Sequence, residues 1–315
     1  MMGIDRPKIE GSVAVEGGRR RIGFAEFGSA TGRAVIWLHG TPGARRQIPT
    51  EARAYAAEHD IRLIGLDRPG VGSSTAHRYR CVAEFPGDLE PVLEALGIDR
   101  FAVIGMSGGG PYALATAHAL PDRVMVAGIV GGVAPTVGPD AIGGGAMALG
   151  SLLAPAVRVA GAPLGKILSS ALGVAAPIAN PAIRLYGRFS PRADRELLAR
   201  PEFRAMFLDD LLHGGSRRME APFADVVAFA QDWGFRVGDV TTPVRWWHGD
   251  HDHIIPYSHG IHMVSLLPDA KLFELPGESH LSALGMSTQI LAELLSVWDD
   301  AERTPMMPAG PLIEP

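Results

Sequence analysis

The chain has 315 residues, of which 47% are hydrophobic and 20% charged, so it is expected to fold around a substantial core. Its net charge is −5 and no basic stripe is present, which argues against a nucleic-acid partner. A single cysteine, Cys81, excludes an internal disulfide framework. Together with a start that lacks the apolar core of a signal peptide, this composition favours a cytoplasmic location.

Short apolar segments alternate with helical segments through the first half of the chain. Strands are expected at residues 21–27, 34–38, 62–66, 101–104 and 124–130, and helices at 52–58, 82–96 and 112–120. Such alternation predicts an α/β fold, in which a mostly parallel sheet is covered by helices on both faces.

The alternation stops after Gly132 and resumes near residue 243. Helices are expected at 195–200, 203–212, 224–233, 258–267 and 281–299, and strands at 243–247 and 271–275. We therefore expect a core of residues 1–134 and 241–300, interrupted by a helical insertion at 135–240. The proline-rich tail at 301–315 is expected to fray.

The weakly charged stretch Ala141–Leu172 is the strongest candidate for membrane contact. A membrane helix needs roughly 20 consecutive apolar residues. Here Pro155 and Pro163 interrupt the stretch, and Arg158 and Lys166 add charge. We expect no transmembrane segment and interpret the stretch as buried or pocket-lining helices. Transient contact with a lipid surface through this region stays open.

Residues 105–109 read G-x-S-x-G and lie between an expected strand and an expected helix. This context is typical of a nucleophile elbow, in which Ser107 occupies a strained turn. Gly105 and Gly109 would then let the strand and helix backbones pass closely. A glycine-rich turn without chemistry would give the same short pattern, so the rest of the chain has to decide.

A serine hydroxyl needs a base, and the base needs an orienting carboxylate. In a sheet of this kind, catalytic groups gather just past the carboxyl ends of the strands. Asp250 and Asp252 follow one late strand and His280 follows the next. The residues alone leave both aspartates as candidates, and either gives the chain order Ser, Asp, His.

Four segments in order carry a resemblance to a known family. They are residues 39–43 (HGTPG), 67–73 (DRPGVGS), 105–109, and the pair 248–252 and 277–280. Over about residues 20–300 the chain resembles members of the α/β-hydrolase superfamily. The resemblance implies a mostly parallel eight-stranded sheet with helices on both faces. It also implies that the insertion is a helical cap after the sixth strand.

The resemblance also implies the site residues. It assigns Ser107 as nucleophile, His280 as base and Asp252, rather than Asp250, as the acid of a catalytic triad. An oxyanion hole would be formed by the backbone N–H groups of Thr41 and Gly108. Losing one such donor typically costs roughly 3–4 kcal/mol of transition-state stabilisation.

Other polar residues near these segments are interpreted without a role in the chemistry. Asp250 is expected to accept hydrogen bonds from loop amides, and His39 to pack beneath the oxyanion loop. Arg68 is interpreted as part of a structural turn. We expect neither a metal nor a cofactor, although several histidines crowd near Asp250: His248, His251, His253, His259 and His262.

The predicted function is hydrolysis of a small hydrophobic carboxylic ester through an acyl-enzyme, in a monomer or homodimer. The same triad serves proline iminopeptidases, carbon–carbon bond hydrolases and cofactor-free haloperoxidases, so these stay as alternatives. A proline iminopeptidase would carry Gly in place of Thr41, and Asp-Gln-Arg-Gly where this chain has Asp67-Arg68-Pro69-Gly70. A non-catalytic ligand-binding protein on the same fold is the alternative of another class.

Overall fold

A computed structural model describes residues 6–145, 187–214 and 221–303. Its centre is an eight-stranded sheet of order β1-β2-β4-β3-β5-β6-β7-β8. The strands are β1 (Ile9–Val15), β2 (Arg20–Gly28), β3 (Arg33–Leu38), β4 (Ile61–Leu66), β5 (Phe101–Met106), β6 (Val124–Val130), β7 (Val244–Gly249) and β8 (Ala270–Leu275). Only β2 runs against its neighbours, and the predicted mostly parallel sheet is confirmed.

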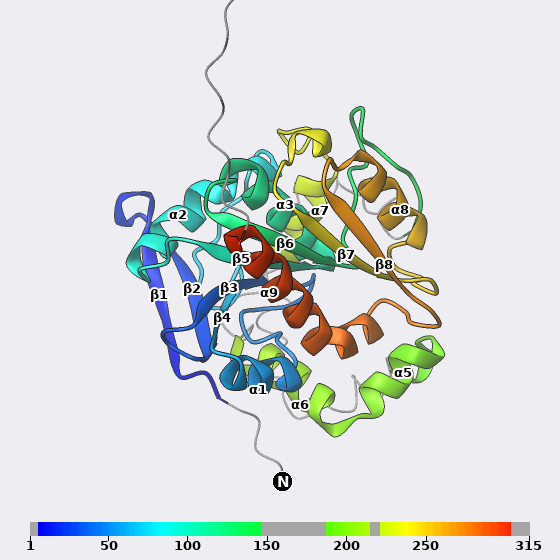
Figure 1. Ribbon diagram of the computed structural model, residues 1–315, viewed down its shortest axis with the longest axis horizontal. Coiled ribbons are helices and arrows are strands. Elements are labelled where there is room, and N and C mark those ends of the chain that lie inside the picture. Colours follow the sequence, from blue (N-terminus) through cyan, green and yellow to red (C-terminus); the bar gives the residue numbers. More distant parts are fainter. Residues whose placement is uncertain (1–5, 146–186, 215–220, 304–315) are drawn as a thin grey trace, which may run out of the picture.

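Helices cover both faces of the sheet (Figure 1). One face carries α1 (Thr50–Glu58) and α9 (Ser287–Arg303), and the other carries α2 (Pro86–Ala95), α3 (Gly110–Ala119) and α8 (Tyr257–Leu266). The alternation of side chains along β7 sends two tryptophans into the two halves of the core. Trp246 packs beneath α8, while Trp247 stacks on Phe273 with ring centroids 4.8 Å apart.

Several element boundaries differ from the sequence expectation. The strand β1 was not expected, and the helix expected at 82–96 is divided into a 3-10 turn (Val82–Glu84) and α2. Proline has no N–H to donate, so Pro86 suits the first turn of a helix better than its interior. The helix expected at 281–299 likewise begins as a 3-10 turn (Ser282–Met286) before α9.

Between β6 and β7 the described residues form helices and no strand. They are α5 (Arg192–Ala199), α6 (Pro201–Asp209), a π-helical turn (Asp210–Gly214) and α7 (Ala221–Phe229). Figure 1 shows α6 beside α1, whereas α7 lies on the α3 side of the sheet, where the Tyr112 and Phe229 rings are 5.8 Å apart.

Two sequence expectations fall wholly or partly outside the described residues. Most of the apolar stretch 141–172 lies there, as do residues 304–315 of the expected tail. Residues 301–303 of that tail are instead the last residues of α9, which corrects its expected start. In the described part of the chain, every helix is too short or too polar to cross a lipid bilayer.

Candidate active site

The turn between β5 and α3 holds Ser107 in a backbone conformation that residues other than glycine rarely adopt. Its φ is +50°, inside the left-handed region, where a non-glycine residue is strained. A Cβ on Gly105 would lie 2.5 Å from the carbonyl oxygen of Gly109, and one on Gly109 would lie 2.3 Å from that of Leu38. Both positions therefore require glycine, because no larger residue lets these backbones pass so closely.

Three side chains from separate loops meet at this turn. Ser107 Oγ lies 2.9 Å from His280 Nε2, and His280 Nδ1 lies 2.7 Å from Asp252 Oδ2. All three are buried, and His280 and Asp252 follow the strands β8 and β7. The backbone N–H groups of Ile254 and Ile255 donate to the other oxygen of Asp252, each at 2.9 Å. The arrangement lets Ser107 donate its proton toward His280 while Asp252 orients the imidazole.

Asp252 stays ionised in this environment. Burial alone would raise the pKa of Asp252. Hydrogen bonds from His248, His280 and the Ile255 amide lower it by more, so the pKa lies well below its usual value. His248 is fully buried, and its Nε2 lies 3.4 Å from Asp252 Oδ2. Because Trp246 Nε1 donates to His248 Nδ1, the ring carries its proton on Nε2, which donates to the Ile255 carbonyl at 2.9 Å and lies beside Asp252. Sequence reasoning assigned no such contact to His248.

Asp250 lies apart from this group of residues. Its Oδ1 accepts the backbone N–H of Gly277 at 2.7 Å, so it joins the loops after β7 and β8. His251 and His253 are exposed. Within residues 6–145, 187–214 and 221–303, no three side chains of the metal-binding types gather closely enough to hold an ion.

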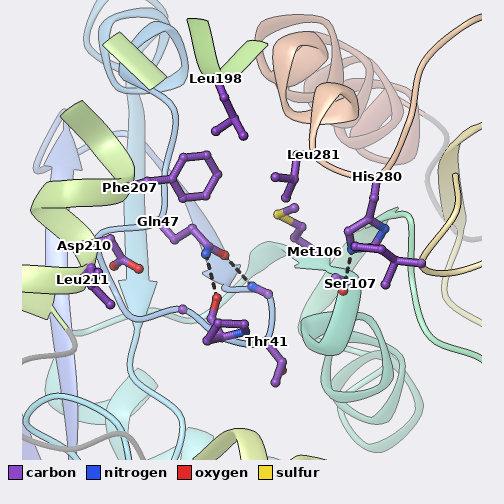
Figure 2. A pocket seen from close by; sticks show the side chains of 14 residues that line it. Thr41, Gln47, Met106, Ser107, Leu198, Phe207, Asp210, Leu211, His280 and Leu281 are labelled. Carbon is purple, nitrogen blue, oxygen red and sulfur yellow. Dashed lines mark hydrogen bonds between the residues drawn. The ribbon is translucent and has the colours of Figure 1, made fainter. Parts of the chain in front are cut away.

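The loop after β3 lies beside Ser107. Gln47 accepts the N–H of Gly40 at 2.6 Å and donates to the carbonyl of Pro42 at 3.1 Å (Figure 2). The N–H of Thr41 has no acceptor among the described residues. Gly108 is the second residue of the helical turn Ser107–Gly109, and the backbone N–H groups at the start of a helix lack intrahelical acceptors. A Cβ on Gly108 would lie 2.3 Å from Thr41 Oγ1, so the two residues adjoin. This geometry suits the stabilisation of an oxyanion.

His39 and Arg68 support the same loop from below. His39 donates from Nδ1 to the Gly40 carbonyl at 2.7 Å and accepts the backbone N–H of Arg68 at 3.3 Å. Burial and the nearby Arg68 charge hold the pKa of His39 well below its usual value, so the ring is neutral. The buried Arg68 guanidinium donates to the carbonyls of His39 and Gly40. Arg68 is thus more than a turn residue, although it stays outside the cavity.

A cavity of about 330 Å³ opens in front of Ser107 and His280. Figure 2 shows Leu198, Phe207 and Leu211 on the far side from these two residues, all from the helices between β6 and β7. Other apolar lining comes from Met106, Ile254 and Leu281. The lining also includes a carboxyl group, that of Asp210. Burial raises the pKa of Asp210 to about 7, although hydrogen bonds from the Ala44 and Arg46 amides act in the opposite direction.

Comparison with known proteins relates this geometry to a known fold. The family model for the alpha/beta hydrolase fold matches residues 33–138. Proline iminopeptidase from Neisseria gonorrhoeae is 36% identical over 109 residues, which are 33% of this chain and 34% of that protein. The match therefore spans about a third of the length of this curated relative.

Solved structures match nearly the whole chain. An esterase from Rhodococcus sp. ECU1013 matches with a TM-score of 0.65 at 21% sequence identity. The match covers 92% of this chain and 98% of the esterase chain. A bromoperoxidase from Bacillus anthracis has a TM-score of 0.64 at 20% identity, covering 93% and 100%. At these identities the structures show the fold alone.

The chain has the α/β-hydrolase fold, which is supported by its sheet order, its elbow turn and the family-model match over residues 33–138. The sequence match is to a proline iminopeptidase, and the structural matches are to an esterase and a bromoperoxidase.

Proposed function

We propose that the protein is a serine hydrolase that cleaves a hydrophobic carboxylic ester through an acyl-enzyme. The observation that carries the proposal is the hydrogen-bonded chain Ser107–His280–Asp252 at the wall of an apolar cavity. A serine on a strained turn, within reach of an imidazole that a carboxylate orients, has the parts needed for nucleophilic attack.

In the proposed reaction, Ser107 Oγ attacks the ester carbonyl carbon while His280 Nε2 accepts the hydroxyl proton. The N–H groups of Thr41 and Gly108 donate to the resulting oxyanion. His280 then gives its proton to the leaving alcohol, which leaves an acyl group on Ser107. A water molecule, deprotonated by His280, attacks this acyl group, and His280 returns the proton to Ser107 Oγ as the carboxylic acid leaves. Asp252 stays ionised throughout and stabilises the imidazolium.

The cavity lining supports a hydrophobic acyl or alkyl group. Leu198, Phe207 and Leu211 face Ser107 across a volume of about 330 Å³, which lies within the usual size range for small-molecule sites. Burying apolar groups of the substrate there contributes about 0.8 kcal/mol per methylene. We therefore propose esters of short to medium chain length as the substrate class.

Proline iminopeptidase activity is the second candidate. It is favoured by the relative from Neisseria gonorrhoeae and by the carboxyl of Asp210, which could pair with the cationic imino nitrogen of an N-terminal proline. The Thr41 and Arg68 motifs depart from those expected of that group. Both candidates use the same nucleophile, so the substrate has to separate them.

The first prediction compares Ser107→Ala with the wild type. We expect the variant to lose at least about 1,000-fold in kcat/KM on p-nitrophenyl esters, because the acyl-enzyme no longer forms. It should also lose rapid labelling by a fluorophosphonate probe. Ser287→Ala is the matched control, since it removes another buried serine hydroxyl, at the start of α9.

Each outcome of this experiment has a distinct meaning. Unchanged ester turnover in Ser107→Ala would refute the proposal. Faster turnover of proline p-nitroanilide than of esters, lost in the same variant, would assign the second candidate. A wild-type protein that neither reacts with the probe nor turns over either substrate would be a ligand-binding member of the superfamily.

A further inference from the structure

Three buried aspartates in the stretch between β6 and β7 point at loops of the core. They are Asp194 in α5, Asp210 directly after α6, and Asp225 in α7, with exposed fractions of 0%, 3% and 2%. A buried carboxylate is costly unless its oxygens accept hydrogen bonds or pair with a cation. The hydrogen-bond donors of these three aspartates therefore show which part of the core each one contacts.

Asp194 accepts hydrogen bonds from the loop that carries His280. Its Oδ1 accepts the backbone N–H of Leu281 at 3.0 Å and that of Ser282 at 2.8 Å. These are the two residues directly after His280, at the start of the turn that precedes α9. A carboxylate of α5 thus fixes the backbone from which the imidazole reaches Ser107.

Asp210 anchors the continuation of the loop that carries Thr41. Its Oδ2 accepts the N–H of Ala44 and its Oδ1 accepts the N–H of Arg46, each at 2.9 Å. Its two oxygens therefore hold a short segment that begins three residues after Thr41.

Asp225 holds Thr41 itself. Its Oδ2 accepts the Thr41 hydroxyl at 2.6 Å and Arg68 Nη2 at 2.7 Å, while its Oδ1 accepts the Tyr112 hydroxyl at 2.9 Å. Arg68 closes the network, because Nη2 also donates to Thr41 Oγ1 at 2.7 Å and to the Gly40 carbonyl at 3.2 Å. The side chain of Thr41 is thereby fixed from α7 and from the loop after β4.

These contacts have one property in common. Each aspartate binds a residue that carries a proposed catalytic group or lies within five residues of one. Catalysis depends on such placement, since a misplacement of about 1 Å can cost 100-fold in rate. Carboxylates that contributed to stability alone would not be expected to contact these loops in particular.

From these contacts we propose that the helices between β6 and β7 position the catalytic loops through Asp194, Asp210 and Asp225. The inference rests on the proposed function, and the three aspartates are positioning residues that do not touch the reacting atoms. The segment thus has two tasks, because its apolar side chains line the cavity while its buried carboxylates hold the oxyanion loop and the His280 loop.

The test uses amide variants of the two aspartates whose contacts lie nearest to the reacting groups. Asp225→Asn and Asp194→Asn keep the side-chain shape and remove the charge. The matched control is Glu196→Gln, which makes the same change at an exposed position of α5. We expect each aspartate variant to lower kcat about 10–100-fold per titrated active site, with KM changed less than threefold, and the control to match the wild type.

Thr41 supplies a second arm, because its backbone N–H survives any change of side chain. Thr41→Val removes the hydroxyl that Asp225 holds, whereas Thr41→Ser keeps it. We expect the valine variant to lose kcat about as much as Asp225→Asn, and the serine variant to recover most of that loss. In the double variant of Asp225→Asn with Thr41→Val, the losses should overlap rather than multiply, since both break one contact.

Hydrogen–deuterium exchange gives a readout that does not depend on activity. Backbone amides of residues 39–47 should exchange faster in Asp225→Asn, and those of residues 278–286 faster in Asp194→Asn. Unchanged exchange, or an unchanged kcat per titrated site despite a lower melting temperature, would overturn the inference. The proposed function is tested separately, by ester turnover and probe labelling of the wild type, so its failure can be distinguished from failure of this inference.

Discussion

At the scale of single residues, Gly108 leaves no room for a side chain beside Thr41. A Cβ there would lie 2.3 Å from Thr41 Oγ1 and 3.0 Å from Thr41 Cβ. The φ of Gly108 is outside the left-handed region, so the contact, and not the backbone conformation, makes glycine necessary. Any larger residue pushes the two proposed oxyanion donors apart.

Gly108→Ala should therefore lower kcat about 10–100-fold with a small change in melting temperature. Steady-state kinetics per titrated active site and thermal unfolding measure the two effects. Gly87→Ala in α2 is the control, since a Cβ there meets nothing within 4 Å. It should leave kcat unchanged and raise stability slightly. A Gly108→Ala enzyme with the kcat of the wild type would show that Thr41 can move away from the new Cβ without impairing catalysis.

Asp210 makes stability depend on pH in an unusual direction. Its pKa is raised from 3.8 to about 7 by burial, so between these values the folded state keeps a proton that the unfolded state has lost. The contribution of Asp210 to stability therefore falls as pH rises from about 4 to 7, and is level above that. In Asp210→Asn this contribution is absent.

The free energy of unfolding of the wild type, relative to Asp210→Asn, should decline over that range by up to about 1.4 kcal/mol per pH unit. Denaturant titrations of both proteins from pH 4 to pH 8 measure the difference. A difference that stays constant with pH would mean that Asp210 is ionised throughout, and would contradict the raised pKa.

The sequence predicted the residues of the site where a local signature exists, and missed those without one. Ser107 is flanked by glycines, and Asp252 and His280 follow strands, so motif and chain order select the residues that the structure brings together. The contact between Asp225 and Thr41 joins residues 184 positions apart. No local pattern marks such a pair, because only the packing of α7 on the core creates it.

At the scale of elements, the buried centre of the sheet was predictable and its edge was not. Strand β5 is apolar and buried at every residue, which gives a clear signal. In β1 only Val13 and Val15 reach the core, and the strand forms because β2 offers an open edge. Its pairing partner, rather than its own composition, makes this segment a strand.

Helix α9 packs closely on the sheet at one glycine of β6. Gly128 in β6 leaves room that Leu294 fills, since a Cβ on this glycine would lie 3.1 Å from Leu294 Cδ1. Leu294 is fully buried. Leu294→Ala should therefore lower the free energy of unfolding by about 2–5 kcal/mol. Denaturant unfolding measures the loss, and Ile261→Ala, at an exposed position of α8, should stay within about 0.5 kcal/mol. Equal losses in both variants would refute this tight packing.

At the scale of the whole molecule, the cavity beside Ser107 should set the preference for acyl-chain length. On p-nitrophenyl esters from acetate to dodecanoate, kcat/KM should rise up to about fourfold per methylene until the cavity is full, and then fall. Leu198→Trp narrows the far wall and should move the maximum to a shorter chain. A maximum that does not move would mean that the acyl chain lies elsewhere.

The length of chain between β6 and β7 also affects how the protein folds during synthesis. More than 100 residues separate β6 from β7, its neighbour in the sheet. At typical rates of synthesis, the ribosome needs roughly 5–20 s to make them. Throughout that interval the apolar strand β6 is the unpaired edge of a growing sheet, a position that invites aggregation. The nascent chain is thus most prone to aggregation after Ser107 has been made and before β7 and β8, the strands that precede Asp252 and His280, exist.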